Sequence, residues 1–218
     1  MHAVRFSLAL QTALLALLLP AASQAADMGG AALPKGALHA KLKYCTACHG
    51  PSGRGFPSGY FPIPRLAGQK LEYIENQLQA FQERRRESQL VLRMSKVHGL
   101  TPAMQTALAE RFGTFNPEPI GGGPRRLVEA GKKLYQEGAP DANVPACAAC
   151  HGPEALGEGI TPRLAGQSYR YLTKELANWQ KERGQHSAED TSAIMAPIAE
   201  SMTQPQIQAV AAYLSHLE

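Results

Sequence analysis

After residue 25 the sequence lacks any apolar run long enough to cross a bilayer, which takes about 20 residues. The N-terminal stretch is different. Arg5 precedes an apolar run from Leu8 to Leu19, and Pro20 and small residues follow as far as Ala25. This order is typical of a secretory signal peptide, and the run is too short for the alternative, a membrane anchor. We therefore predict that residues 1–25 are a signal peptide cut after Ala25 and that the rest of the chain is exported.

A concentrated excess of basic residues is also missing. Residues 27–123 carry 12 basic and 7 acidic side chains, and residues 124–218 carry 9 and 11. Neither half has the dense positive charge that phosphate binding requires, so we expect no nucleic-acid partner. The opposite signs of the two halves form an electrical dipole, which can orient an approaching protein.

No stretch of alternating apolar and polar residues is long enough to predict a strand, whereas helical patterns recur. In residues 69–87 and 167–185 the apolar side chains repeat on one helical face. Thr101 and Thr203 each precede an apolar run with a proline near its start, which indicates a helix N-terminus. These patterns predict an all-α fold.

The sequence contains one unit twice, and the six residues PRLAGQ occur unchanged in both, at 64–69 and 162–167. A stretch rich in proline and glycine, residues 115–124, separates the repeats and indicates a linker. We therefore predict two tandem domains, which we call the first copy (residues 27–114) and the second copy (residues 125–218).

Only four cysteines are present, in two close pairs that could not join distant segments. Cys45 and Cys48 form one pair, Cys147 and Cys150 form the other, and a histidine follows each. Cysteines at i and i+3 share one helical face, where they can bond two haem vinyl groups as thioethers, and CxxCH is the attachment motif of c-type haem. A redox CxxC needs a βαβ context, and zinc needs four ligands where each copy gathers three. We predict two covalently bound haem c groups.

The histidine after each cysteine pair, His49 or His151, is placed to bind the iron from one side. The ligand on the other side decides the function, because a methionine or histidine there closes the iron and leaves electron transfer. Met195 stands in an expected loop before the last helix of the second copy, and Met94 stands at the matching place in the first. We predict both as sixth ligands, with His98 as the alternative to Met94.

Other conspicuous side chains carry weaker signals. The run Arg84–Arg86 is interpreted as the solvated face of a helix, with a docking patch for an acidic partner as the alternative. Tyr73 and Tyr171 are expected to pack in the core or against haem rather than to relay radicals. Met104 and Met202 are expected to pack in the core.

Two CxxCHG units, each followed by PRLAGQ, an aromatic-led helix, a methionine and a terminal helix, resemble the dihaem cytochrome c4 family. The resemblance covers nearly all of the chain after the predicted signal peptide. It implies two class I cytochrome c domains related by a pseudo-twofold axis, with their haems facing each other across the interface. It also implies that the carbonyl oxygens of Pro64 and Pro162 accept a hydrogen bond from the iron-binding histidines, which would tune the metal. We further hypothesise that the leucine of PRLAGQ packs on the porphyrin and that its glycine lets the backbone turn.

The resemblance further implies a periplasmic electron carrier of a respiratory chain, whose partners are redox proteins such as an oxidase, a reductase or a dehydrogenase. Peripheral membrane association stays open, and no obligate small-molecule substrate is expected. The alternative is a dihaem electron-transfer subunit of a dehydrogenase complex such as a flavocytochrome. An enzyme in its own right is not expected, because a cysteine-ligated catalytic haem would need a fifth cysteine and the matched methionines close both irons.

The copies differ at two places. The loop from His49 to Pro64 is four residues longer than the loop from His151 to Pro162, and Arg111 stands where the second copy has Tyr213. We therefore expect the rim of the first haem and the packing of the first terminal helix to differ from those of the second copy.

Overall fold

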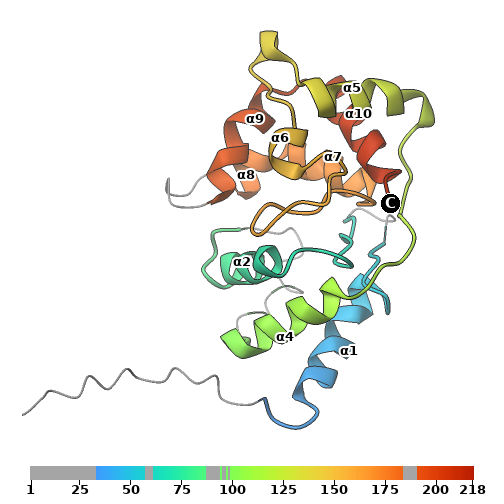
Figure 1. The fold of residues 1–218 in the computed structure, drawn as a ribbon. Coiled ribbons are helices and arrows are strands. Elements are labelled where there is room, and N and C mark those ends of the chain that lie inside the picture. The colour runs from blue at the N-terminus through green and yellow to red at the C-terminus, as the bar shows by residue number, and fades with distance from the viewer. Residues whose placement is uncertain (1–32, 57–60, 87–93, 95–96, 98, 184–190) are drawn as a thin grey trace, which may run out of the picture. The chain divides into compact units, whose positions relative to one another are not determined.

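The computed structural model describes residues 33–56, 61–86, 94, 97, 99–183 and 191–218. These residues form helices and connecting loops. The described part of the chain contains isolated β-bridges but no strand. The all-α prediction is confirmed. The described helices of the first copy include α1 (Ala37–His49), α2 (Leu71–Gln82) and α4 (Pro102–Gly113), drawn from blue to green in Figure 1.

The helices of the second copy that the structure describes include several short ones, drawn from yellow-green to red in Figure 1. They are α5 (Val128–Glu137), α6 (Ala148–His151), α7 (Tyr169–Ala177), α8 (Trp179–Glu182), α9 (Met195–Ser201) and α10 (Gln204–Ser215). Three short 3₁₀ turns accompany them: η2 (Arg125–Leu127), η3 (Pro140–Ala142) and η4 (Thr191–Ile194).

The terminal helix of each copy begins where its threonine predicts. The Thr101 side chain accepts a hydrogen bond from the Met104 N–H at 3.3 Å, with proline in the first turn of α4. Thr203 caps α10 in the same way, and its own N–H donates to Gln206 Oε1 at 2.8 Å. This reciprocal capping box satisfies two backbone donors that the first helical turn would otherwise leave unpaired.

The cysteine-bearing helices differ between the copies, although the repeat predicts the same plan for both. In the first copy CxxCH ends the 13-residue helix α1. In the second copy α5 stops before Gly138, whose φ of 72° favours glycine, and Asn143 is also left-handed. The motif therefore lies on a separate four-residue helix, α6.

The core of the second copy lies where α5 crosses α10. A Cβ atom on Gly131 would lie 1.9 Å from the carbonyl oxygen of Ala209, so only glycine allows the two backbones to approach this closely. Tyr135 is fully buried there and packs against Tyr213, with ring centroids 5.5 Å apart. In the first copy the corresponding terminal helix buries Leu108 and Phe112 instead.

Arg111, at the place of Tyr213, is exposed, and its guanidinium lies over the Phe115 ring at 4.6 Å. The terminal helices therefore pack differently, as their sequences predict.

The connecting stretch after α4 is held by hydrogen bonds along its length. Arg65 Nη1 donates to the carbonyl oxygen of Pro117 at 2.7 Å, and the Ile120 N–H donates to Gly166 O at 3.3 Å. His216 Nε2 lies 2.9 Å from Gly123 O. Residues 31–218 form one unit, which contains the second copy and every described residue of the first. Among the described residues, no helix has the length and apolar character needed to span a membrane.

Candidate haem-binding sites

Each copy presents a pair of free thiols on one helical turn. Cys45 and Cys48 belong to the last turns of α1. Cys147 is the residue just before α6, and Cys150 lies within that helix. Burial raises the pKa of Cys45 and of Cys147, because it disfavours the charged thiolate. The i, i+3 spacing places both sulfur atoms of a pair on the same face of the helix.

The histidine after each pair is fixed by a proline carbonyl. His49 Nδ1 lies 3.0 Å from Pro64 O, and His151 Nδ1 lies 3.0 Å from Pro162 O. A carbonyl oxygen can only accept, so Nδ1 must carry the hydrogen and the lone pair of the neutral ring resides on Nε2. Burial lowers the pKa of both histidines and so favours this neutral form. Each imidazole is therefore prepared to bind a metal through Nε2.

The loop after each histidine closes through backbone hydrogen bonds that bring the proline back to the ring. The Gly55 N–H donates to His49 O at 2.8 Å, and the Gly157 N–H donates to His151 O at 3.0 Å. A Cβ atom on Gly55 would lie 2.4 Å from Ile63 O, and φ there is +81°. The loop could not return to the histidine with a larger residue at this place.

The glycine of each PRLAGQ stretch also has a left-handed backbone. Gly68 and Gly166 both have φ of 69°, and their N–H groups donate to Phe112 O and Leu214 O at 3.0 and 2.9 Å. PRLAGQ is thereby attached to the terminal helix of its own copy, and the chain turns into α2 or α7. The leucine of the stretch is partly buried and packs on the core of its copy.

The last residue of PRLAGQ connects the two copies, a role that the sequence did not predict. Gln167 Oε1 accepts a hydrogen bond from the Arg65 N–H at 2.8 Å, and Gln167 Nε2 donates to Arg65 O at 3.0 Å. Gln69 forms the same two contacts with the backbone of Arg163, at 2.7 and 3.0 Å. We call these contacts the glutamine bridges. The one sequence signal for them is that the stretch shared unchanged by both copies includes the glutamine.

The methionines divide into a half-buried pair and a buried pair. Met195 is half-buried. It is the first residue of α9, so it begins a helix where the sequence predicted a loop. Met94 is also half-buried and packs against a small core cluster of the first copy. Met104 and Met202 are buried in the cores, as predicted. His98, the alternative to Met94, lies outside the described residues.

A cluster of charged and hydroxyl groups joins the two copies. Arg86 Nη2 donates to Tyr171 Oη at 2.8 Å and lies 3.3 Å from Glu175 Oε2. Arg183 pairs with the same carboxylate oxygen and donates to Tyr171 Oη at 3.2 Å. The side chains of Arg86, Glu175 and Arg183 are 11%, 8% and 5% exposed. The interpretation of Arg86 as part of a solvated face is therefore wrong, because its side chain is largely buried and bonded to Tyr171 and Glu175 of the other copy.

Glu175 is the charged member of a pair of equivalent positions. Burial alone would raise the pKa of its carboxyl, but the positive charges of Arg183, Arg86 and Lys174 outweigh burial and lower it to about 2. The first copy has the neutral Gln77 at this place, and its Oε1 accepts from Arg86 Nη1 at 2.7 Å. Burial raises the pKa of Tyr171 to about 12, so its hydroxyl stays protonated at neutral pH. At neutral pH the carboxyl of Glu175, on α7 of the second copy, is therefore ionised within the cluster.

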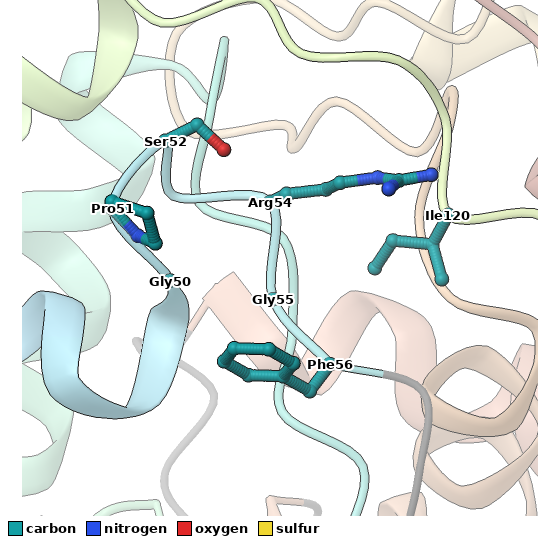
Figure 2. A pocket seen from close by; sticks show the side chains of 7 residues that line it. All are labelled: Gly50, Pro51, Ser52, Arg54, Gly55, Phe56 and Ile120. Carbon is teal, nitrogen blue, oxygen red and sulfur yellow. The ribbon is translucent and has the colours of Figure 1, made fainter.

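A cavity of about 260 Å³ opens beside the first CxxCH, on the loop that follows it. Figure 2 shows the Arg54 side chain extending toward Ile120, with Phe56 near the other end of the loop. Neither Cys45 nor His49 lines this cavity. It is therefore separate from the residues that would attach a haem.

The donor groups of each copy fit a covalently attached haem. Two thiols on one helical turn precede an imidazole whose Nδ1 is already bonded and whose Nε2 is available for iron. Large apolar side chains next to these groups are exposed, as a porphyrin-binding surface requires: Tyr44 beside Cys45 is 46% exposed, and Ile194 beside Met195 is 64% exposed.

Comparisons with known proteins agree with this geometry. The pattern of the cytochrome c family matches residues 34–114 and again residues 128–218. Cytochrome c4 of Thiocapsa roseopersicina is 36% identical over 177 residues, which are 79% of this chain and 86% of that protein. The thiosulfate dehydrogenase electron acceptor of Thiomonas intermedia is 35% identical over 174 residues, 78% of this chain and 77% of that protein.

A solved structure of cytochrome c4 from Acidithiobacillus ferrooxidans superimposes with a TM-score of 0.68 at 35% identity, covering 80% of this chain and 99% of that one. The chain therefore belongs to the cytochrome c family, with two such domains in tandem. Within that family it is a dihaem cytochrome of the c4 type, an electron carrier with two covalently bound haem c groups. The predicted fold class, cofactors and general function are confirmed.

Proposed function

We propose that this protein carries single electrons between redox proteins of the periplasm, at two haems that are each bound by a histidine and a methionine. The observation that supports this best is the repeated geometry of the iron-binding side. Both copies follow a thiol pair with an imidazole whose Nδ1 lies 3.0 Å from a proline carbonyl. When bound, haem c supplies a reversible one-electron change between ferric and ferrous iron.

The residues of each copy hold and orient that group. Thioethers from Cys45 and Cys48, and from Cys147 and Cys150, would prevent its loss from a small domain outside the cytoplasm. The proline carbonyl keeps the imidazole in one tautomer and one orientation and raises its basicity toward iron. A more basic ligand stabilises the ferric state, so this contact contributes to the potential of each haem.

Met94 and Met195 are the proposed sixth ligands. Both are half-buried, whereas Met104 and Met202 are already packed in the cores. If these methionines bind the second side, neither iron would have an open position for peroxide or a gas, which would favour transfer of electrons over catalysis. Thioether ligation also raises the potential of a haem relative to ligation by two histidines.

The test is to produce the protein in a host that exports it and attaches haem c. We expect two haems per chain by the pyridine haemochrome assay, sharp reduced absorption bands, and a reversible two-electron titration. Peroxide should not be consumed. A single haem per chain, or turnover of peroxide at a rate above free haem, would contradict the proposal.

A second candidate places the protein as the partner of a dehydrogenase that supplies its electrons. The similarity to the thiosulfate dehydrogenase electron acceptor of Thiomonas intermedia favours this candidate. The two candidates differ in whether the protein is free or bound. The test is size-exclusion chromatography of the protein from its native cells. A bound subunit would elute with a second polypeptide at fixed stoichiometry, whereas a free carrier would elute as the 23.4 kDa chain alone, less any signal peptide.

A further inference from the structure

We propose that Gln69 and Gln167 are positioning residues, each of which tunes the potential of the haem in the opposite copy. The inference rests on the proposed function, because it needs both haems and their histidine ligands. It concerns the glutamine bridges, and neither glutamine is among the proposed iron ligands.

One peptide group takes part in both contacts. The carbonyl of Pro64 accepts from His49 Nδ1 at 3.0 Å. The N–H of Arg65 belongs to that same planar peptide group and donates to Gln167 Oε1 at 2.8 Å. The side chain of the second copy is therefore two hydrogen bonds from the iron ligand of the first.

The relationship is reciprocal. The peptide group between Pro162 and Arg163 accepts from His151 at 3.0 Å through its carbonyl and donates to Gln69 Oε1 at 2.7 Å through its N–H. Each glutamine follows its own copy's proline by five residues, yet its amide contacts the proline peptide of the other copy.

The orientation of both amides is specified by their surroundings. Gln69 and Gln167 are buried, at 7% and 5% exposed. Each Oε1 also accepts from the next backbone N–H of its own chain segment, Lys70 or Ser168, at 2.9 Å. A flipped amide would place its NH₂ group against two N–H donors, so the oxygen must face the arginine N–H.

The direction of the effect follows from polarisation of the peptide group. A peptide whose N–H donates a hydrogen bond has a more negative carbonyl oxygen, because hydrogen bonds in a chain strengthen one another. A stronger acceptor at the histidine Nδ1 makes the imidazole more basic, which stabilises ferric iron. Each glutamine bridge therefore lowers the potential of the opposite haem, and its loss raises that potential.

The experiment compares Gln167→Leu with Gln69→Leu in the haem-loaded protein. Each haem's potential is measured by redox titration followed by NMR, with the hyperfine-shifted signals assigned to a copy through contacts with that copy's residues. We expect Gln167→Leu to raise the potential of the first haem more than that of the second, and Gln69→Leu to do the reverse. The two variants control for each other, because the chemical change is the same at equivalent positions.

Two other outcomes would overturn the proposal. If each variant shifted mainly the haem of its own copy, the glutamine would act locally. If both variants shifted both haems alike, the bridges would only hold the copies together. Should leucine prevent assembly, Gln167→Glu and Gln69→Glu keep a charged and therefore stronger acceptor for the arginine N–H. Each should then lower the potential of the opposite haem more than that of its own copy's haem. If the wild type carries two normal haems and the variants show no crossed shift, the inference is refuted while the proposed function stays intact.

Discussion

The ring of Phe112 fills the space that a side chain on Gly53 would need. A Cβ atom on Gly53 would lie 2.9 Å from Cδ1 of that ring, and Gly53 has φ of +66°. The second copy has Ala155 and Leu214 at these two places, and Ala155 has φ of 58°. The larger Phe112 accompanies Gly53 in the first copy, and the smaller Leu214 accompanies Ala155 in the second. The side chains at these two positions therefore share one volume.

Gly53→Ala should therefore lower the free energy of unfolding by about 2–4 kcal/mol, from left-handed strain and from overpacking against Phe112. Adding Phe112→Leu should recover about 1–2 kcal/mol of that loss, because the two sites are in contact. Denaturant unfolding of the haem-loaded single and double variants measures this coupling. Strict additivity of the two changes would show that the volume is not shared.

Pro162→Ala tests the contact that orients the second histidine. Alanine keeps the carbonyl but frees the backbone φ angle that proline fixes, so the contact with His151 Nδ1 should weaken. We expect the second haem's potential to rise while the first changes little, as a redox titration would show. Pro64→Ala is the matched control and should affect the first haem. If neither potential moves in either variant, PRLAGQ has a purely structural role.

The features that the sequence predicts best are local. The cysteine pair, the following histidine and the threonine caps lie within a few residues of the groups that they serve, so spacing alone is informative. The proline contacts were implied by resemblance to the c4 family and correspond to observed distances of 3.0 Å.

The contacts that the sequence does not predict depend on the other copy. Arg86 belongs to a run of three arginines, and a local pattern cannot show that Tyr171 and Glu175 lie within reach of it, 85 and 89 residues away. Gln167 is similar, since its partner Arg65 is 102 residues away. Such contacts form only when the two copies pack, and propensity and periodicity carry no information about that packing.

Glu175→Gln should destabilise the protein by about 3–5 kcal/mol at neutral pH, because Arg183 and Arg86 would stay buried without their carboxylate. The loss should depend on pH in a defined direction. The pKa of Glu175 falls from 4.5 to about 2 on folding, so the unfolded chain binds the proton at higher pH than the native chain. The stabilisation is therefore fully present above about pH 4.5 and is lost as the pH falls toward 2.

Thermal or urea unfolding of both proteins between neutral and acidic pH measures this difference. Glu137→Gln is the control, since that carboxylate is 64% exposed and lies 4.0 Å from Lys133, and it should change stability by less than about 0.5 kcal/mol. A difference between wild type and Glu175→Gln that stayed constant down to pH 2 would mean that the carboxylate is not the stabilising group.

Met195→Ala and Met94→Ala test the proposed sixth ligands. Removing a thioether ligand opens one iron, so each variant should bind carbon monoxide at one reduced haem at neutral pH, whereas the wild type should bind none. The absorption spectrum of the reduced protein under carbon monoxide measures this. Met202→Leu and Met104→Leu replace methionines buried in the two cores and should leave both irons closed. If Met94→Ala leaves the first iron closed while His98→Ala opens it, the histidine is the ligand there, and the two haems would have different ligand sets.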